Sequence, residues 1–116
     1  MAEITVYQKP TCTTCKKVYA ALKESGVDFA AIDYYVEPIP KRKLKELVQK
    51  MGISASELFR KKEEIYKDLK LAEKNLSDDE AIELMSVYPD LLERPIVEKG
   101  DKAILARPAG RLKEIL

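Results

Sequence analysis

Cys12 and Cys15 are the two cysteines of this 116-residue chain, and they form a C-x-x-C motif. A thiolate is a strong nucleophile, and a second thiol nearby can attack any mixed disulfide that the first one forms. The chain contains no histidine, which excludes a Cys-His pair, a Ser-His-Asp triad and a histidine metal ligand. A helix terminus, a cation or the other thiol must therefore activate the nucleophile.

The sequence around the motif predicts how the two thiols divide their roles. Glu3–Tyr7 is a β-branched and aromatic run that predicts a strand, and apolar residues at helical spacing follow from Thr13. Cys12 is therefore expected at a helix N-terminus, where free amide groups and the helix dipole favour a thiolate. We predict that Cys12 is the attacking thiol and that Cys15, inside the first turn, resolves the product.

The motif has two other interpretations, a pair of buried structural cysteines and part of a zinc site. Buried cysteines often act as small hydrophobic residues, but the strand-loop-helix setting favours redox chemistry. A zinc site needs four ligands, so two cysteines without histidine would require a second chain. We expect no metal.

The elements that position these thiols can be read along the chain. Gly26 is expected to end the first helix, and Val27–Tyr34 reads as a mostly buried strand, which makes a parallel β-α-β unit. The middle of the chain is helical. Helices are predicted over 41–51 and near 55–59, 62–68 and 78–87, with capping boxes at Ser54–Glu57 and Ser77–Glu80.

Sheet character returns late in the chain. Arg94–Val97 and Lys102–Leu105 are expected as strands around a Glu98–Asp101 turn, and Ala109–Leu116 as a final helix. The order β-α-β, helices, β-β-α predicts one α/β domain over residues 1–116 with a helical insertion at about 38–90.

The composition is typical of a globular protein, and the net charge gives little support for nucleic-acid binding. Hydrophobic residues make up 46% and charged residues 35%, and 21 basic against 20 acidic residues leave a net charge of +1. We expect no direct DNA binding and no membrane span. No secretory signal is visible at the start, and two cysteines are few for a secreted scaffold, so the expected location is the cytoplasm.

The sequence resembles the glutaredoxin-coupled arsenate reductase and Spx family nearly from end to end. The resemblance rests on an ordered set of motifs: Ile4–Tyr7 with Pro10–Cys12, Met51–Ser54, Leu58–Lys61, Leu71–Glu73, Ser77–Asp79, Tyr88–Leu92, Arg94–Ile96 and Arg107–Pro108. It implies a thioredoxin-like core, at about 1–37 and 91–116, that carries the helical insertion.

The resemblance also implies a chemistry. In the arsenate reductases of this family one cysteine attacks arsenate and three arginines hold the oxyanion, which by matching motifs are Cys12, Arg60, Arg94 and Arg107. Guanidinium groups suit an oxyanion because they donate paired hydrogen bonds. Glutathione and glutaredoxin are the expected reductants, with no bound cofactor. Pro95 resembles the cis proline that thioredoxin-like folds place beside the active cysteine.

Two alternatives stay open, because Cys15 stands where those enzymes tend to have serine and where Spx proteins have cysteine. One is a general thiol-disulfide reductase that uses Cys12 with Cys15, coupled to glutathione or thioredoxin. The other is an Spx-type redox switch that binds the RNA polymerase alpha subunit. The Arg107-Pro108 pair, which the Spx branch generally lacks, favours the arsenate reductase.

Overall fold

The computed structural model describes residues 3–116, so Met1 and Ala2 of the expected core lie outside the described residues. The chain divides into two compact units. The first comprises the residues up to Glu37 together with Arg94–Leu116, and the second is Pro38–Glu93. No helix of the described residues is long and apolar enough to cross a membrane.

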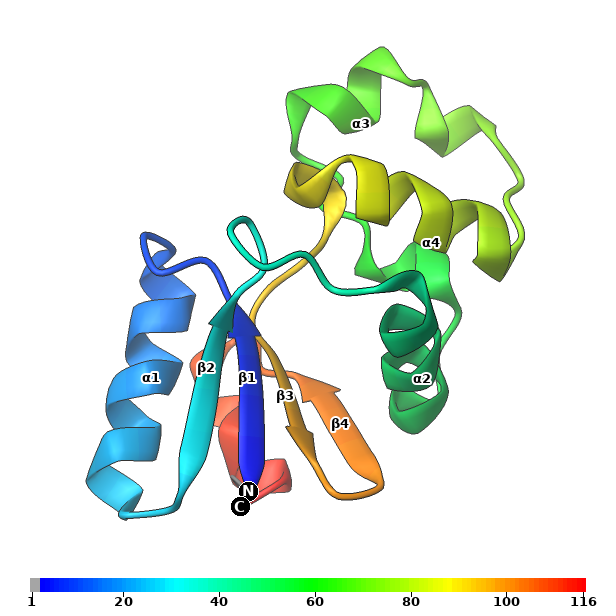
Figure 1. Ribbon diagram of the computed structural model, residues 1–116. Helices are drawn as coiled ribbons and strands as arrows, with labels where there is room; N and C mark the ends of the chain where they lie inside the picture. Colours follow the sequence, from blue (N-terminus) through cyan, green and yellow to red (C-terminus); the bar gives the residue numbers. More distant parts are fainter. Residues whose placement is uncertain (1–2) are drawn as a thin grey trace. The chain divides into compact units, whose positions relative to one another are not determined.

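The first unit is built on a four-stranded sheet in the order β2-β1-β3-β4 (Figure 1). Strand β1 (Ile4–Gln8) pairs in parallel with β2 (Phe29–Asp33) and antiparallel with β3 (Ile96–Lys99), which pairs antiparallel with β4 (Lys102–Leu105). Helix α1 (Thr13–Ser25) joins the two parallel strands, and Gly26 ends it with the positive φ of 74° that glycine adopts most easily. The predicted parallel β-α-β unit is confirmed.

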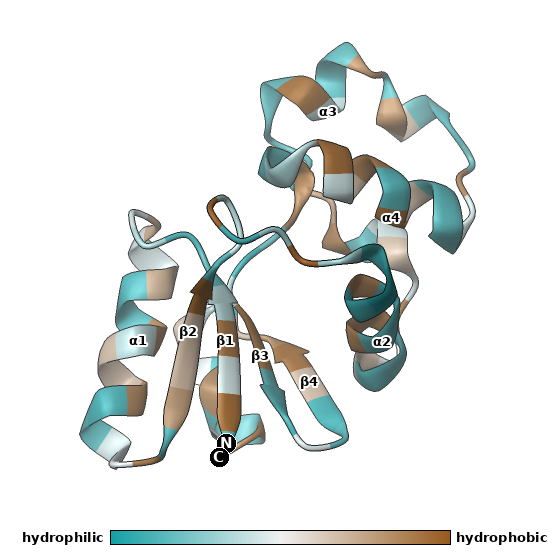
Figure 2. Ribbon diagram, in the orientation of Figure 1, coloured by the Kyte–Doolittle hydropathy of each residue, from teal (hydrophilic) through white to brown (hydrophobic). Residues whose placement is uncertain are grey.

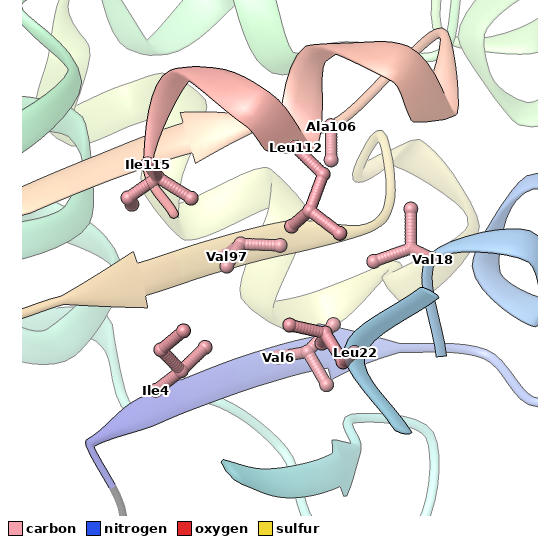
Figure 3. Close-up of a cluster of buried hydrophobic side chains, with 8 residues drawn as sticks. All are labelled: Ile4, Val6, Val18, Leu22, Val97, Ala106, Leu112 and Ile115. Carbon is pink, nitrogen blue, oxygen red and sulfur yellow. The ribbon is translucent and has the colours of Figure 1, made fainter. Parts of the chain in front are cut away.

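One apolar core fixes α1 and the C-terminal 3-10 helix η4 (Ala109–Glu114) to the same face of the sheet. Figure 3 shows how its side chains point toward one another from the strands and both helices. The core consists of Ile4, Val6, Val18, Leu22, Val97, Ala106, Leu112 and Ile115. Alternate residues of β1 supply two of these side chains, as the two-residue period of a strand requires.

The second unit is helical (Figure 1). Its elements are α2 (Lys41–Met51), η1 (Ala55–Leu58), α3 (Glu64–Asp68), η2 (Leu71–Glu73), α4 (Asp78–Val87) and η3 (Pro89–Leu91). The apolar stripe of α2 stands out in Figure 2 against its hydrophilic remainder, and Leu44, Leu47 and Val48 are the buried members. Both predicted capping boxes are present, at Ser54–Glu57 and Ser77–Glu80.

The expected fold class, an α/β thioredoxin-like fold with an inserted helical part, is confirmed, but three local predictions were wrong. Strand β2 is not mostly buried: it is shorter than Val27–Tyr34 and lies at the sheet edge with Ala30 and Ala31 exposed. Strand β3 begins at Ile96, because Pro95 cannot donate to the ladder, and runs on to Lys99. The final helix is a 3-10 helix that stops at Glu114.

Candidate active site

Cys12 is the N-cap residue of α1, directly after the loop that leaves β1. Its backbone is extended, its amide donates to the Lys9 carbonyl at 2.9 Å, and its carbonyl accepts from the Lys16 amide at 3.0 Å. No acidic residue occupies the first turn of α1, so no carboxylate there competes for the free amide groups. The partly buried sulfur therefore lies at the positive end of the helix.

The surroundings of Cys12 favour its thiolate. Partial burial raises the pKa of the Cys12 thiol. Hydrogen bonds from the Cys15 amide and thiol, and from Arg107 and Arg94, lower it by more, so the resulting pKa is about 7 against an ordinary 9.0. A thiolate is thus half formed near neutral pH. This value is in the range of reactive cysteines.

Cys15 has the opposite character. It is fully buried, and this burial, together with the negative charge of Cys12, raises the pKa of its thiol to about 12. Cys15 therefore stays protonated and acts as a hydrogen-bond donor to the Cys12 sulfur. Of the two thiols, Cys12 is the one whose surroundings favour the thiolate form.

Arg107 contacts the reactive sulfur directly. Its Nη1 lies 3.9 Å from Cys12 Sγ and also donates to the Arg94 carbonyl oxygen at 3.1 Å. The backbone places Arg107 here because the Ala106 amide, just after β4, donates to the Pro95 carbonyl at 2.9 Å. Two segments that are distant in sequence are thereby brought side by side at the sulfur.

Arg94 is the most buried cation of the site, at 6% exposure. Its Nη1 donates to the hydroxyls of Tyr35 at 3.1 Å and Tyr34 at 3.4 Å, and its Nε has no partner among the described residues. Burial lowers the pKa of a guanidinium, but the two tyrosines and Cys12 outweigh it and the pKa of Arg94 is raised. The Arg94 guanidinium is therefore charged. Its Nη1 is held by the two tyrosine hydroxyls, and its Nε is a hydrogen-bond donor without a partner among the described residues.

The sequence did not identify Tyr34 and Tyr35 as part of this site. They follow β2 directly, the Tyr34 amide donates to the Gln8 carbonyl at 3.3 Å, and the Tyr35 amide donates to the Asp33 carboxylate at 3.0 Å. Burial raises the pKa of Tyr34, so its hydroxyl stays protonated. The signal was available: the carboxyl ends of parallel strands share one edge of a sheet, where sites form.

Prolines follow both arginines of the site. The Arg94–Pro95 peptide bond is cis, as expected from the resemblance, and so is Arg107–Pro108. The second was not predicted.

Arg60 lies in the other unit, Pro38–Glu93, and is described within it. Its Nε donates to Glu63 at 3.1 Å and its Nη1 to Glu93 at 3.0 Å. The Arg60 amide donates to the Leu91 carbonyl at 2.7 Å, which fixes the backbone between η1 and α3. In residues 3–116 no cluster of acidic residues and cysteines could hold a metal ion.

A cysteine whose thiolate is favoured at a helix N-terminus, with guanidinium groups beside it on a thioredoxin-like fold, is typical of a thiol-based active site. Residues 7–115 match the model of the ArsC family, and the chain belongs to that family.

Comparison with individual proteins agrees with this assignment. The chain is 37% identical to an arsenate reductase of Escherichia coli K12 over 116 residues, which cover all of this chain and 82% of that one. It is 32% identical to an arsenate reductase of Neisseria meningitidis over 117 residues, which span both chains completely. A solved structure of an arsenate reductase from Vibrio cholerae superposes with a TM-score of 0.92 at 34% identity, over 99% of this chain and 98% of that one.

Proposed function

We propose that this protein is a thiol-dependent oxidoreductase that reduces arsenate, with Cys12 as the nucleophile and arginines holding the oxyanion. The observation that carries the proposal is the cluster at one sulfur: Arg107 Nη1 lies 3.9 Å from Cys12 Sγ and donates to the Arg94 carbonyl. Similarity to arsenate reductases over the whole chain supports the same substrate class.

The proposed first step forms a bond between Cys12 and arsenic. The Cys12 thiolate attacks As(V), and one arsenate oxygen leaves as water after protonation. The positive charges of Arg94 and Arg107 offset the repulsion between the Cys12 thiolate and the arsenate anion. The unpartnered Nε of Arg94 is a donor that an oxyanion oxygen can satisfy.

The second step transfers two electrons. The thiol of glutathione loses its proton and bonds to the Cys12 sulfur, the sulfur–arsenic bond breaks, and its electron pair stays on arsenic. As(V) becomes As(III), and two thiols become one disulfide. Glutaredoxin then reduces this mixed disulfide, in a cytoplasm whose glutathione pool is reducing.

Arg60 enters the proposal through the family's motif. Within its own unit its guanidinium is paired with Glu63 and Glu93, so its charge is largely compensated there. We propose it as the third oxyanion ligand, with a smaller effect than Arg94 or Arg107.

A second candidate function, a thiol-disulfide reductase, is favoured by Cys15. The Cys15 thiol is hydrogen-bonded to the Cys12 sulfur, so it stands close enough to attack a mixed disulfide formed on Cys12. In that cycle the arginines stabilise the thiolate and no oxyanion is held.

One experiment separates the two candidates. Arsenate-dependent NADPH oxidation is measured with glutathione, glutaredoxin and glutathione reductase, and reduction of a small neutral disulfide is measured in parallel. Arg94→Ala and Arg107→Ala should each lower arsenate turnover roughly ten- to a hundredfold. Arg107→Lys should recover only part, because lysine lacks the planar fork. Surface Arg111, paired with Glu114, gives the matched control Arg111→Ala, which should leave arsenate turnover unchanged.

Disulfide reduction should fall much less in the two site variants. Equal losses in both assays would assign the arginines to thiolate activation instead of anion binding. A parent protein that reduces disulfides but not arsenate would replace the first candidate with the second.

A further inference from the structure

Gln8 is a buried polar side chain that the proposed arsenate chemistry does not use. It ends β1, is 7% exposed, and its Oε1 has no hydrogen-bond partner among the described residues. Ile4 and Val6, two and four residues earlier, face α1 in the apolar core, so the alternation of the strand directs Gln8 to that same side. A buried acceptor without a partner is costly, so it needs a donor from outside the chain.

Gln8 lines a cavity of about 350 Å³ together with Pro10, Lys16 and Tyr19. This volume is at the lower end of small-molecule sites, ~300–1,000 Å³. Neither Arg94 nor Arg107 lines the cavity, so it is distinct from the arginine cluster.

The cavity lies next to the reactive cysteine along α1. Cys12, Lys16 and Tyr19 are spaced four and three residues apart, so they share one face of the helix. The Lys16 amide donates to the Cys12 carbonyl at 3.0 Å, which places Lys16 one turn below the N-cap. The lining residue Lys16 is therefore one helical turn from the reactive cysteine.

The lining has a definite chemical character. Lys16 is exposed, with no carboxylate partner among residues 3–116. Tyr19 is held edge-on by Phe29 at 5.4 Å, and Lys23 Nζ lies 5.7 Å from its ring centre, so a second cation stands beyond the aromatic wall. The cavity thus combines a buried acceptor, an aromatic wall and cations at the rim.

We propose that this cavity binds the thiol that recycles Cys12, and that its ligand is a short peptide thiol with a free carboxylate, such as glutathione. The carboxylate pairs with Lys16, a peptide N–H or ammonium group satisfies Gln8 Oε1, and the sulfur faces Cys12. This assignment rests on the proposed function, in which a thiol must attack a sulfur bound to Cys12.

The test follows that attack without arsenate. Cys15→Ser protein carries Cys12 as a mixed disulfide with thionitrobenzoate, and the attacking thiol is glutathione. The glutathione thiol loses its proton, its sulfur bonds to Cys12, the old disulfide breaks, and coloured thionitrobenzoate leaves. The rate should saturate with glutathione concentration. Lys16→Glu should raise the half-saturating concentration roughly tenfold, as loss of a charge-assisted contact predicts.

Lys17→Glu is the matched control, because it changes the same charge at the next exposed residue and Lys17 does not line the cavity. It should leave the half-saturating concentration nearly unchanged. 2-Mercaptoethanol, which has no carboxylate, should react without saturation and alike in all three proteins. Circular dichroism should show the same fold in each.

A second measurement uses the native chain and the unreactive S-methylglutathione. NMR signals of the Gln8 side-chain amide, Lys16 and Tyr19 should shift saturably with the peptide concentration. A linear rate with glutathione, equal losses in Lys16→Glu and Lys17→Glu, or no such NMR shifts would overturn the assignment. Neither measurement contains arsenate. If the protein does not reduce arsenate, the proposed function is overturned, but the assignment of the cavity is still tested by these two measurements.

Discussion

At the scale of single residues, the site depends on the difference in acidity between two thiols one helical turn apart. Cys12 is partly exposed and surrounded by donors, so its pKa is lowered to about 7, whereas burial raises that of Cys15 to about 12. The sequence predicted this order from the helix start alone. The structure adds Arg107, Arg94 and the Cys15 thiol as causes.

The first prediction concerns alkylation of Cys12 by iodoacetamide. Only the thiolate reacts, and lowering the pKa makes it available at lower pH, so the rate should rise with pH, reach half its maximum near pH 7 and level off above it. Mass spectrometry of the peptides should find Cys12 labelled and Cys15 untouched. Arg107→Ala should move the midpoint to higher pH. Equal labelling of the two thiols would contradict the assignment.

Tyr34 and Tyr35 affect the site through Arg94, whose guanidinium group they hold by hydrogen bonds. Their hydroxyls accept from one nitrogen of Arg94, and Lys9 Nζ lies 4.7 Å from the centre of the Tyr35 ring. They are positioning residues, because they hold the guanidinium and leave its Nε unpartnered. Two adjacent tyrosines at the end of a strand carry no such meaning until the fold places Arg94 beside them.

At the scale of elements, local signals set where the helices begin and end. Helix α2 spans Lys41–Met51 and α4 spans Asp78–Val87, as predicted. Pro40 precedes α2, and the positive φ of 68° at Gly52 ends it. Ser77 opens α4: its hydroxyl accepts from the Glu80 amide at 3.2 Å, and the Glu80 carboxylate accepts from the Ser77 amide at 3.0 Å.

The second prediction tests this cap. Ser77→Ala removes the acceptor of a free amide and should destabilise the helical unit by about 1 kcal/mol, within a range of ~0.5–2. Urea unfolding followed by circular dichroism at 222 nm gives the free energy. Ser86→Ala is the matched control in the same helix, since its exposed hydroxyl only donates back to the Glu83 carbonyl. A loss of stability as large in the control would refute a specific capping role.

At the scale of the whole molecule, burial in the sheet core holds the active-site loop in place. Val18 and Leu22 anchor α1 to β1, so the N-terminus of α1 is fixed at the end of that strand. The Tyr7 hydroxyl on the opposite sheet face donates to the buried Glu98 carboxylate at 3.1 Å, which links β1 to β3. Cys12 follows β1 and Arg94 precedes β3, so the pairing of these two strands brings the Cys12 sulfur and the Arg94 guanidinium together.

The third prediction tests the core. Leu22 is fully buried, and Leu22→Ala should lower the free energy of unfolding by ~2–5 kcal/mol, because it removes apolar contacts and leaves a cavity. The exposed neighbour Glu24 supplies the control, and Glu24→Ala should change stability by less than ~0.5 kcal/mol. Urea unfolding of both variants gives the two values. An equally small effect of both would mean that the α1 contact is not part of the stable core.

The sequence by itself determined the fold class, the helices that begin at capping boxes or end at glycine, and the position of Cys12. These features depend on neighbours within a few residues, through helical spacing, caps and turn residues, so a linear pattern contains them. The family resemblance supplied Arg94 and Arg107, which no local pattern separates from other surface arginines.

Only the tertiary structure decided the rest. That β2 is an edge strand with exposed Ala30 and Ala31 depends on which strands pair, and its apolar residues could not tell edge from centre. Arg107 meets Cys12 across 95 positions of sequence, and Arg94 meets Tyr35 across 59. Such contacts follow from the packing of distant segments on one sheet, and the unpartnered oxygen of Gln8 was visible only once its neighbours were in place.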